Sequence, residues 1–167
     1  GEVVLMAKQG ITLDKGSVIT ANGPSAGNVT VQSESGAVTV AGTIEVNSTQ
    51  GSGGVISIAS GASAGNPSIA SGTVAVAGTV EANALQGRGG AISIVGQQGV
   101  SVEAGARVTA NGVDGGSVML ASGKGSVSVA GLIAANAEMG RAGTIAVRAA
   151  EVTLAPGAQL SANGGRG

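Results

Sequence analysis

One stretch of the chain decides its fold: GGAISIVGQQGVSVEAGARVTAN, at residues 89–111. It contains three short runs in which apolar residues alternate with small or polar residues, and glycine is frequent between the runs. Alternation of this kind is typical of β-strands that bury one face. The stretch therefore predicts three short strands that are joined by tight, glycine-rich corners.

The same three runs recur along the whole chain, and the third run ends each time on asparagine. The intervals between these asparagines are 25, 36, 28, 25 and 27 residues. Periods of about 20 to 50 residues are the signature of solenoids and related arrays. The chain is therefore expected to be one structural unit copied along an axis. The asparagines, here called the asparagine row, are Asn22, Asn47, Asn83, Asn111, Asn136 and Asn163.

The alternation also predicts which side chains face the interior. In the run at 100–102, Val100 and Val102 are expected to point inward and Ser101 outward, and the run at 127–129 repeats this pattern. Stacked copies of three such strands make three parallel sheets around a narrow aliphatic core. The predicted fold class is all-β: a right-handed parallel β-helix, or β-solenoid, of about six coils with three short strands each. The right hand follows from the general rule for parallel crossovers.

Residues 1–167 are expected to form a single β-helix segment, and the third coil carries an insertion at 59–72. Fifteen residues separate Ile58 from Val74, where the other coils need 4 to 6. Insertions of this kind often carry binding function, but the small residues of this one favour a tolerated loop without a partner. The candidate contact residues within it are Asn66, Pro67, Ser68 and Ile69. Neither end shows a capping pattern, so the segment is expected to belong to a longer solenoid.

Composition narrows the functional classes. Of 167 residues 32 are glycine, and there is no Phe, Tyr, Trp, Cys or His. The formal net charge is −1, so nucleic acid is not an expected partner. No apolar stretch approaches the roughly 18 residues of a membrane-spanning helix. Few groups are suited to acid–base or nucleophilic catalysis, and we expect no enzymatic activity, no catalytic residue, no metal and no cofactor.

Three sets of polar residues are candidate sites. The asparagine row is predicted to be structural, because stacked amides at a corner bond to neighbouring coils and asparagine tolerates a left-handed backbone. Glu45 and Glu81 occupy one outward position in adjacent coils, and a solvated pair is favoured over a glycosidase or calcium site. Arg88, Arg141 and Arg166 share the corner after the third run, where they are expected to make that edge soluble.

The order GGxIxI, then VxV, then GxIxAN resembles the repeat body of filamentous-haemagglutinin-like exoproteins, the secreted passengers of the two-partner pathway in Gram-negative bacteria. The copies GTIEVN at 42–47 and GTVEAN at 78–83 carry the third part of this pattern. The resemblance implies a right-handed β-helix, an extracellular or cell-surface location, and adhesion. The secretion motifs NPNL and NPNG of such proteins are not matched by Asn66-Pro67-Ser68. Autotransporter passengers share the implied fold.

The expected function is that of a structural and adhesive segment of a secreted bacterial surface filament, which supplies reach and rigidity. Its expected partners are the flanking coils of the same filament and a host-cell receptor or glycan. Two rival functions fit the same residues. One is a carbohydrate-binding or carbohydrate-active β-helix, and the other is the stalk of a contact-dependent toxin delivery protein.

Overall fold

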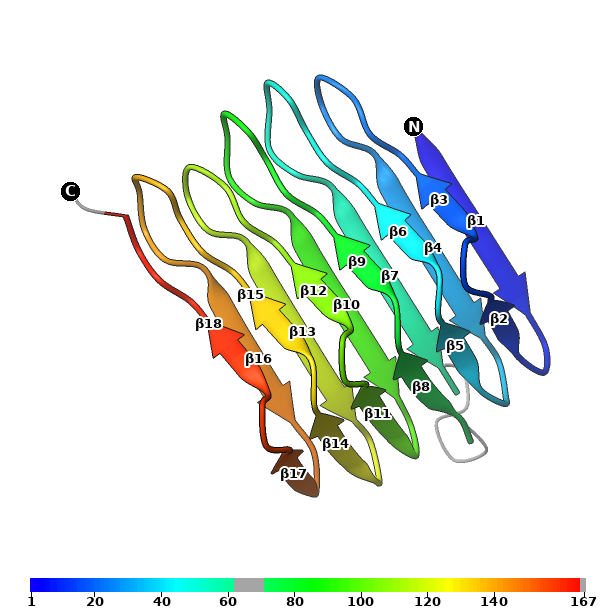
Figure 1. Ribbon diagram of the computed structural model, residues 1–167. Coiled ribbons are helices and arrows are strands. Elements are labelled where there is room, and N and C mark those ends of the chain that lie inside the picture. Colours follow the sequence, from blue (N-terminus) through cyan, green and yellow to red (C-terminus); the bar gives the residue numbers. More distant parts are fainter. Residues whose placement is uncertain (62–70, 166–167) are drawn as a thin grey trace.

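The molecule is a stack of six coils, each of which contributes one strand to each of three sheets (Figure 1). The computed structural model describes residues 1–61 and 71–165, and within these ranges it contains eighteen β-strands and no helix. All strand pairs are parallel, and each strand pairs with its equivalents in the neighbouring coils. The predicted all-β solenoid of about six coils is confirmed.

The first sheet holds the longest strand of each coil. Its strands follow one another in chain order along the stack. They are β1 (Glu2–Ala7), β4 (Asn28–Ser33), β7 (Val55–Ser60), β10 (Ala91–Gly96), β13 (Ser117–Ser122) and β16 (Thr144–Arg148).

The second and third sheets consist of shorter strands. The second sheet contains β2 (Ile11–Leu13), β5 (Val38–Val40), β8 (Thr73–Val76), β11 (Gly99–Val102), β14 (Ser126–Val129) and β17 (Glu151–Leu154). The third sheet contains β3 (Val18–Thr20), β6 (Thr43–Glu45), β9 (Thr79–Glu81), β12 (Arg107–Thr109), β15 (Leu132–Ala134) and β18 (Gln159–Ser161).

The core is a column of aliphatic side chains enclosed by the three sheets. Val100 and Val102 of β11 are at most 2% exposed, and Ser101 between them lies on the outer face. Residues 127–129 of β14 repeat this arrangement in the next coil, where the strands pair residue for residue. The predicted facing of both runs is confirmed. Burial of one apolar face fixes this register, because a slip by one residue would expose every inward side chain.

Four of the six strands of the first sheet begin and end two residues later than the alternating runs indicate. The run GGVISI, at 53–58, corresponds to the strand Val55–Ser60. Ala59 and Ser60 were expected to leave the stack with the insertion, but they pair with Gln32 and Ser33 of the preceding coil. Ser60 is buried, and its hydroxyl donates a hydrogen bond to the carbonyl oxygen of Gly36. The predicted start of the insertion at residue 59 is therefore wrong. A serine can end a buried strand when its hydroxyl group has a hydrogen-bond partner.

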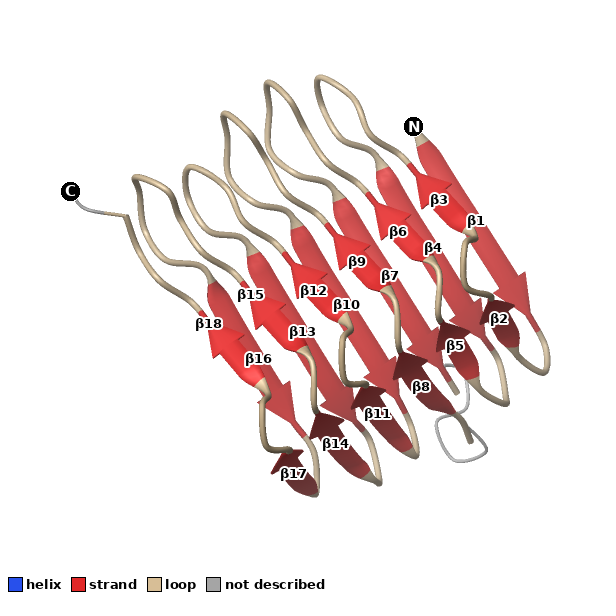
Figure 2. Cartoon of the chain, in the orientation of Figure 1, coloured by secondary structure: helices blue, strands red, loops and turns tan. Residues whose placement is uncertain are grey.

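A loop projects from the stack between the third strand of each coil and the first strand of the next. Figure 2 shows these loops as a row beyond the ends of the sheets. We call them the corner arms, and they comprise residues 22–27, 47–54, 83–90, 111–116 and 136–143. Each arm begins on a residue of the asparagine row and ends on glycine. The base of each arm is closed by a backbone hydrogen bond of 2.6 to 3.1 Å from that glycine to the residue before the asparagine.

The closing glycines form a column in which neighbouring backbones approach closely. A Cβ atom on Gly90 would lie 2.1 Å from the carbonyl oxygen of Gly54, in the coil before it. A Cβ atom on Gly116 would lie 2.2 Å from the carbonyl oxygen of Gly90. Real Cβ contacts do not reach such distances, so only glycine fits these positions. The complete column is Gly27, Gly54, Gly90, Gly116 and Gly143.

Candidate functional site

The asparagine row forms a continuous hydrogen-bonded ladder along the stack. The side-chain Oδ1 of each member accepts a hydrogen bond from the backbone N–H of the equivalent asparagine in the next coil. The five donor–acceptor distances are 2.6, 2.9, 2.8, 2.7 and 2.8 Å from Asn22 to Asn163. Each oxygen therefore satisfies a backbone donor at the base of an arm, where strand pairing has ended. The expected bonding between coils is found.

The left-handed backbone expected for these asparagines is not found. Among the described residues every positive φ angle belongs to glycine. The length of the asparagine side chain is what matters instead. It brings the amide oxygen across the spacing of about 4.8 Å between coils, where the oxygen can accept a hydrogen bond. A backbone N–H rather than a second amide is the donor at each step.

The amide nitrogens of the row have different environments. Nδ2 of Asn22 donates to Glu45 Oε2 at 3.1 Å, and Nδ2 of Asn83 donates to Thr109 Oγ1 at 3.0 Å. Thr109 pairs with Glu81 in the third sheet, at the position that was expected to face outward, and it is only 2% exposed. Its burial was not expected from the sequence. The hydrogen bond from Asn83 explains how a hydroxyl group is accommodated there.

A groove lies between the asparagine row and the corner arms on the side of the third sheet. We call it the amide groove, and its volume is about 400 Å³. Among the described residues, the amide nitrogens of Asn47 and Asn111 have no hydrogen-bond partner, and neither nitrogen is buried. Leu85 in the wall is 65% exposed. The groove is lined by Asn47, Ser48, Thr49, Asn83, Ala84, Leu85, Asn111, Gly112 and Glu138.

A second hollow lies where the arms of the third, fourth and fifth coils meet. We call it the arginine hollow, and its volume is about 730 Å³. Arg88 is paired through its backbone with Asp114, and the N–H of Arg141 donates to Asp114 Oδ1 at 2.9 Å. Asp114 therefore lies between Arg88 and Arg141 along the stack, one coil from each. The hollow is lined by Arg88, Asp114, Gly115, Met139, Gly140, Arg141, Ala142 and Gly165.

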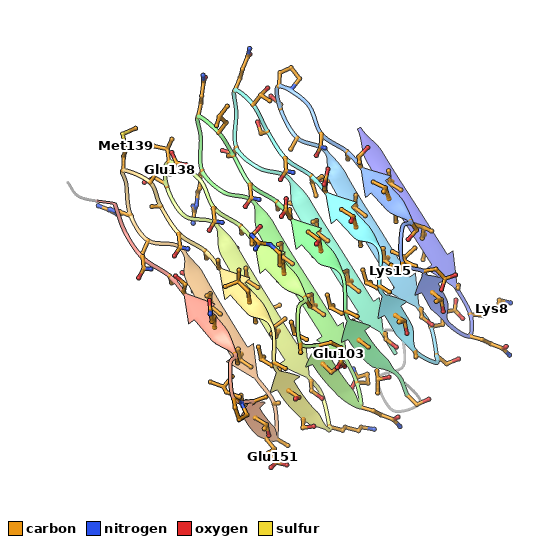
Figure 3. All side chains as sticks on the ribbon, in the orientation of Figure 1. Lys8, Lys15, Glu103, Glu138, Met139 and Glu151 are labelled. Carbon is orange, nitrogen blue, oxygen red and sulfur yellow. The ribbon has the colours of Figure 1, made fainter. Side chains whose placement is uncertain are left out.

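The arm of the fifth coil carries side chains that point away from the sheets. Figure 3 shows Glu138 and Met139 at the outer end of the arm between β15 and β16, whereas Glu151 lies at the opposite edge of the stack. Met139 is 65% exposed. The arm therefore presents one face to the amide groove, through Glu138, and another to the arginine hollow, through Met139.

The other predicted polar positions lie as follows. Glu45 and Glu81 are direct partners in β6 and β9, so the expected equivalence of their positions in adjacent coils is found. Over residues 1–61 and 71–165 no three Asp or Glu side chains come together as a possible metal site. The candidate contact residues Asn66, Pro67, Ser68 and Ile69 lie outside the described residues, and so does Arg166.

Sequence reasoning missed the two hollows because it treated the corner arms only as connections. The arms bond to one another: the N–H of Leu85 donates to the carbonyl oxygen of Ser48, and the N–H of Glu138 donates to that of Gly112, both at 2.9 Å. Their residues show no apolar period that would indicate such order. The available signal was that a glycine follows each of the first five asparagines of the row by either five or seven residues.

The described part of the chain contains no helix with the length and apolarity to cross a membrane. We compared the chain with protein-family models, with curated proteins and with solved structures, and none of the three comparisons found a match.

Proposed function

We propose that this chain is a structural and adhesive segment of a secreted filament on a bacterial surface, in which the coils supply reach and rigidity. The observation that carries the proposal is the unbroken stacking of six coils through three parallel sheets. The resemblance of the repeat to filamentous-haemagglutinin-like exoproteins supports the surface location and the adhesive role.

Rigidity follows from the direction of the hydrogen bonds. The strands lie across the stack, so the bonds between paired strands run along it and resist both stretching and bending. The asparagine ladder adds a fourth line of bonds at the base of the arms. The core adds a continuous column of packed aliphatic side chains, which excludes water. A structure of this kind transmits force along its axis.

Single-molecule force measurement tests the mechanical part of the proposal. When the chain is held at its two termini and stretched, we expect the coils to detach one at a time. A coil of 25 to 36 residues should release about 90 to 130 Å of extended chain. Loss of the whole fold in one event, or extension without measurable resistance, would contradict a mechanical role.

Antibody labelling tests the location. An antibody raised against the purified chain should label intact cells of the bacterium that produces it, and beads coated with the chain should attach to host cells. Labelling that requires permeabilised cells would contradict surface display. Beads that attach no better than uncoated beads would contradict the adhesive part alone.

The amide groove favours carbohydrate binding as a second candidate function. It combines amide donors, the carboxylate of Glu138, the hydroxyl of Thr49 and the apolar surface of Leu85. Sugars present hydroxyl groups and C–H faces, which these donors, acceptors and apolar atoms complement. The groove crosses several coils, so an extended glycan fits it better than a compact sugar.

A glycan array probed with the purified chain tests this candidate. The variants Glu138→Gln and Thr49→Val should weaken any specific binding, because they remove an acceptor charge and a hydroxyl from the groove. The matched controls are Glu151→Gln and Thr12→Val, which make the same changes on strands of the second sheet. Equal losses in the test and control pairs would contradict a site in the groove.

A further inference from the structure

The arginine hollow has the chemistry of an anion site. Its lining contains two guanidinium groups and one carboxylate, which gives a net single positive charge on a chain whose net charge is −1. The carboxylate of Asp114 accepts its hydrogen bond from the backbone N–H of Arg141 rather than from a guanidinium group. This bond uses none of the guanidinium donors of the hollow.

Arg88 is held in place by its neighbours. Its Nε donates a hydrogen bond of 3.3 Å to the carbonyl oxygen of Gly115. This bond fixes the plane of the guanidinium group and leaves the two terminal amino groups free to donate. A planar guanidinium with two free amino groups matches the oxygens of a carboxylate or phosphate.

Asp114 is turned toward the backbone. Its Oδ1 accepts the hydrogen bond from the N–H of Arg141. A Cβ atom on residue 140 would lie 1.9 Å from this oxygen, so Gly140 is what makes room for the carboxylate. One oxygen of Asp114 thus accepts a hydrogen bond from the backbone of the lining. The negative charge of Asp114 repels an anion in the hollow and weakens its binding.

Three glycines of the lining use their backbone donors within the fold. The N–H of Gly115 donates to Arg141, the N–H of Gly140 to Val113, and the N–H of Gly165 to Gly140, at 2.8 to 3.0 Å. The two arginine side chains supply the charged donors of the lining. Met139 adds an exposed apolar side chain beside them, next to which the body of a larger ligand can pack.

We propose that the arginine hollow binds an oxyanion, a carboxylate or phosphate group carried by a small molecule, through Arg88 and Arg141. The lining extends from the arm of the third coil to Gly165, which follows the last strand of the sixth coil, and the two arginines come from the arms of the third and the fifth. Equivalent positions two coils apart are separated by about 10 Å, so the ligand binds across the arm of the fourth coil rather than within a single arm. The proposal does not depend on the adhesive or carbohydrate-binding function.

Isothermal titration of the purified chain at low salt tests the site, with inorganic phosphate and glucuronate as separate probes. Binding of phosphate supports a site for a free oxyanion, and binding of glucuronate alone supports a carboxylate on a larger body that contacts Met139. Binding of neither probe overturns the proposal. Added salt should weaken the binding, because the attraction is between charges.

Three variants test the residues. Arg88→Gln and Arg141→Gln should each weaken binding about tenfold or more, the usual effect of losing a hydrogen bond to a charged group. Asp114→Asn should tighten binding, because the amide oxygen can still accept from Arg141 while the opposing charge is removed. The matched control is Arg148→Gln, which removes the same charge from the end of β16, outside the lining. A loss in the control as large as that in Arg141→Gln, or weaker binding by Asp114→Asn, overturns the proposal.

Discussion

Oδ1 of Asn111 accepts a hydrogen bond of 2.7 Å from the backbone N–H of Asn136, which lies one coil further along the stack. The two residues are 25 positions apart in the sequence. The bond is one step of a ladder that continues where the strands of the third sheet have ended. It couples the bases of two corner arms through a side chain rather than through strand pairing.

Replacement of Asn111 by alanine should lower the free energy of unfolding by about 1 to 3 kcal/mol, because a backbone donor loses its partner. Asn111→Asp keeps an oxygen acceptor and should lose less. Urea denaturation followed by circular dichroism measures both effects. The control Asn28→Ala removes an exposed amide of β4 and should change stability by no more than about 0.5 kcal/mol. A loss in Asn111→Ala no larger than in this control would show that the ladder is incidental.

Replacement of Val102 by aspartate should be severe, with a loss of more than about 4 kcal/mol, because an unpaired charge would enter a dry core. The side chain is 1% exposed in the wild type. Ser128→Asp places the same group on the outer face of the next strand and should leave the chain folded. Thermal melts of the two variants make the comparison. Similar melting temperatures would mean that the inward register is wrong.

Two glycine substitutions should distinguish two causes of destabilisation: a clash between neighbouring coils and strain from a positive φ angle. Gly105 has a φ angle of 87° and nothing within 4 Å of its would-be Cβ, so Gly105→Ala should cost about 1 to 2 kcal/mol through strain alone. Gly90→Ala must push apart two coils at the glycine column, and we expect it to be much more damaging. Denaturation midpoints measure the difference. Gly105→Ala as the worse variant would contradict the close approach at Gly90.

Deletion of residues 62–70 should leave the fold intact. The strands on either side end at Ser60 and begin at Thr73, so Gly61, Ser71 and Gly72 would remain as a connection. The fifth coil joins β13 to β14 by a connection of the same length, residues 123–125. Circular dichroism and melting temperature should be unchanged. Loss of the β-sheet signal would show that the deleted residues belong to the coil.

The same deletion tests the candidate contact residues 66–69. If they bind a host-cell receptor or glycan, beads coated with the shortened chain should attach less well although the fold is kept. Attachment equal to that of the full chain would assign the segment to a tolerated insertion without a partner.

The sequence predicted the stack and its register because both depend on a simple alternation. Val100, Ser101 and Val102 differ in polarity, and only one arrangement buries the apolar pair. The end of β7 was missed because Ala59 and Ser60 are small and carry no such contrast. Their place in the sheet is decided by pairing with the preceding coil and by the hydrogen bond of the serine hydroxyl, neither of which is visible in a local pattern.

The candidate sites were less accessible to sequence reasoning than the fold. Arg88 and Arg141 were recognised as sharing one corner, but the hollow between them depends on how three arms stack. The burial of Thr109 likewise depends on a residue 26 positions away, Asn83. Both features arise from contacts between coils, and the polar residues of the arms follow no period that would predict those contacts.

The glycine column has a consequence for how such a chain can change its length. Each closing glycine must lie against the backbone of its predecessor, whereas the arms that project outside the stack vary from six to eight residues without loss of this contact. Additional residues are accommodated either outside the stack or as a complete coil that brings its own glycine and asparagine. Duplication of whole coils is therefore the route by which this architecture grows, and its length increases in steps of one strand spacing, about 4.8 Å.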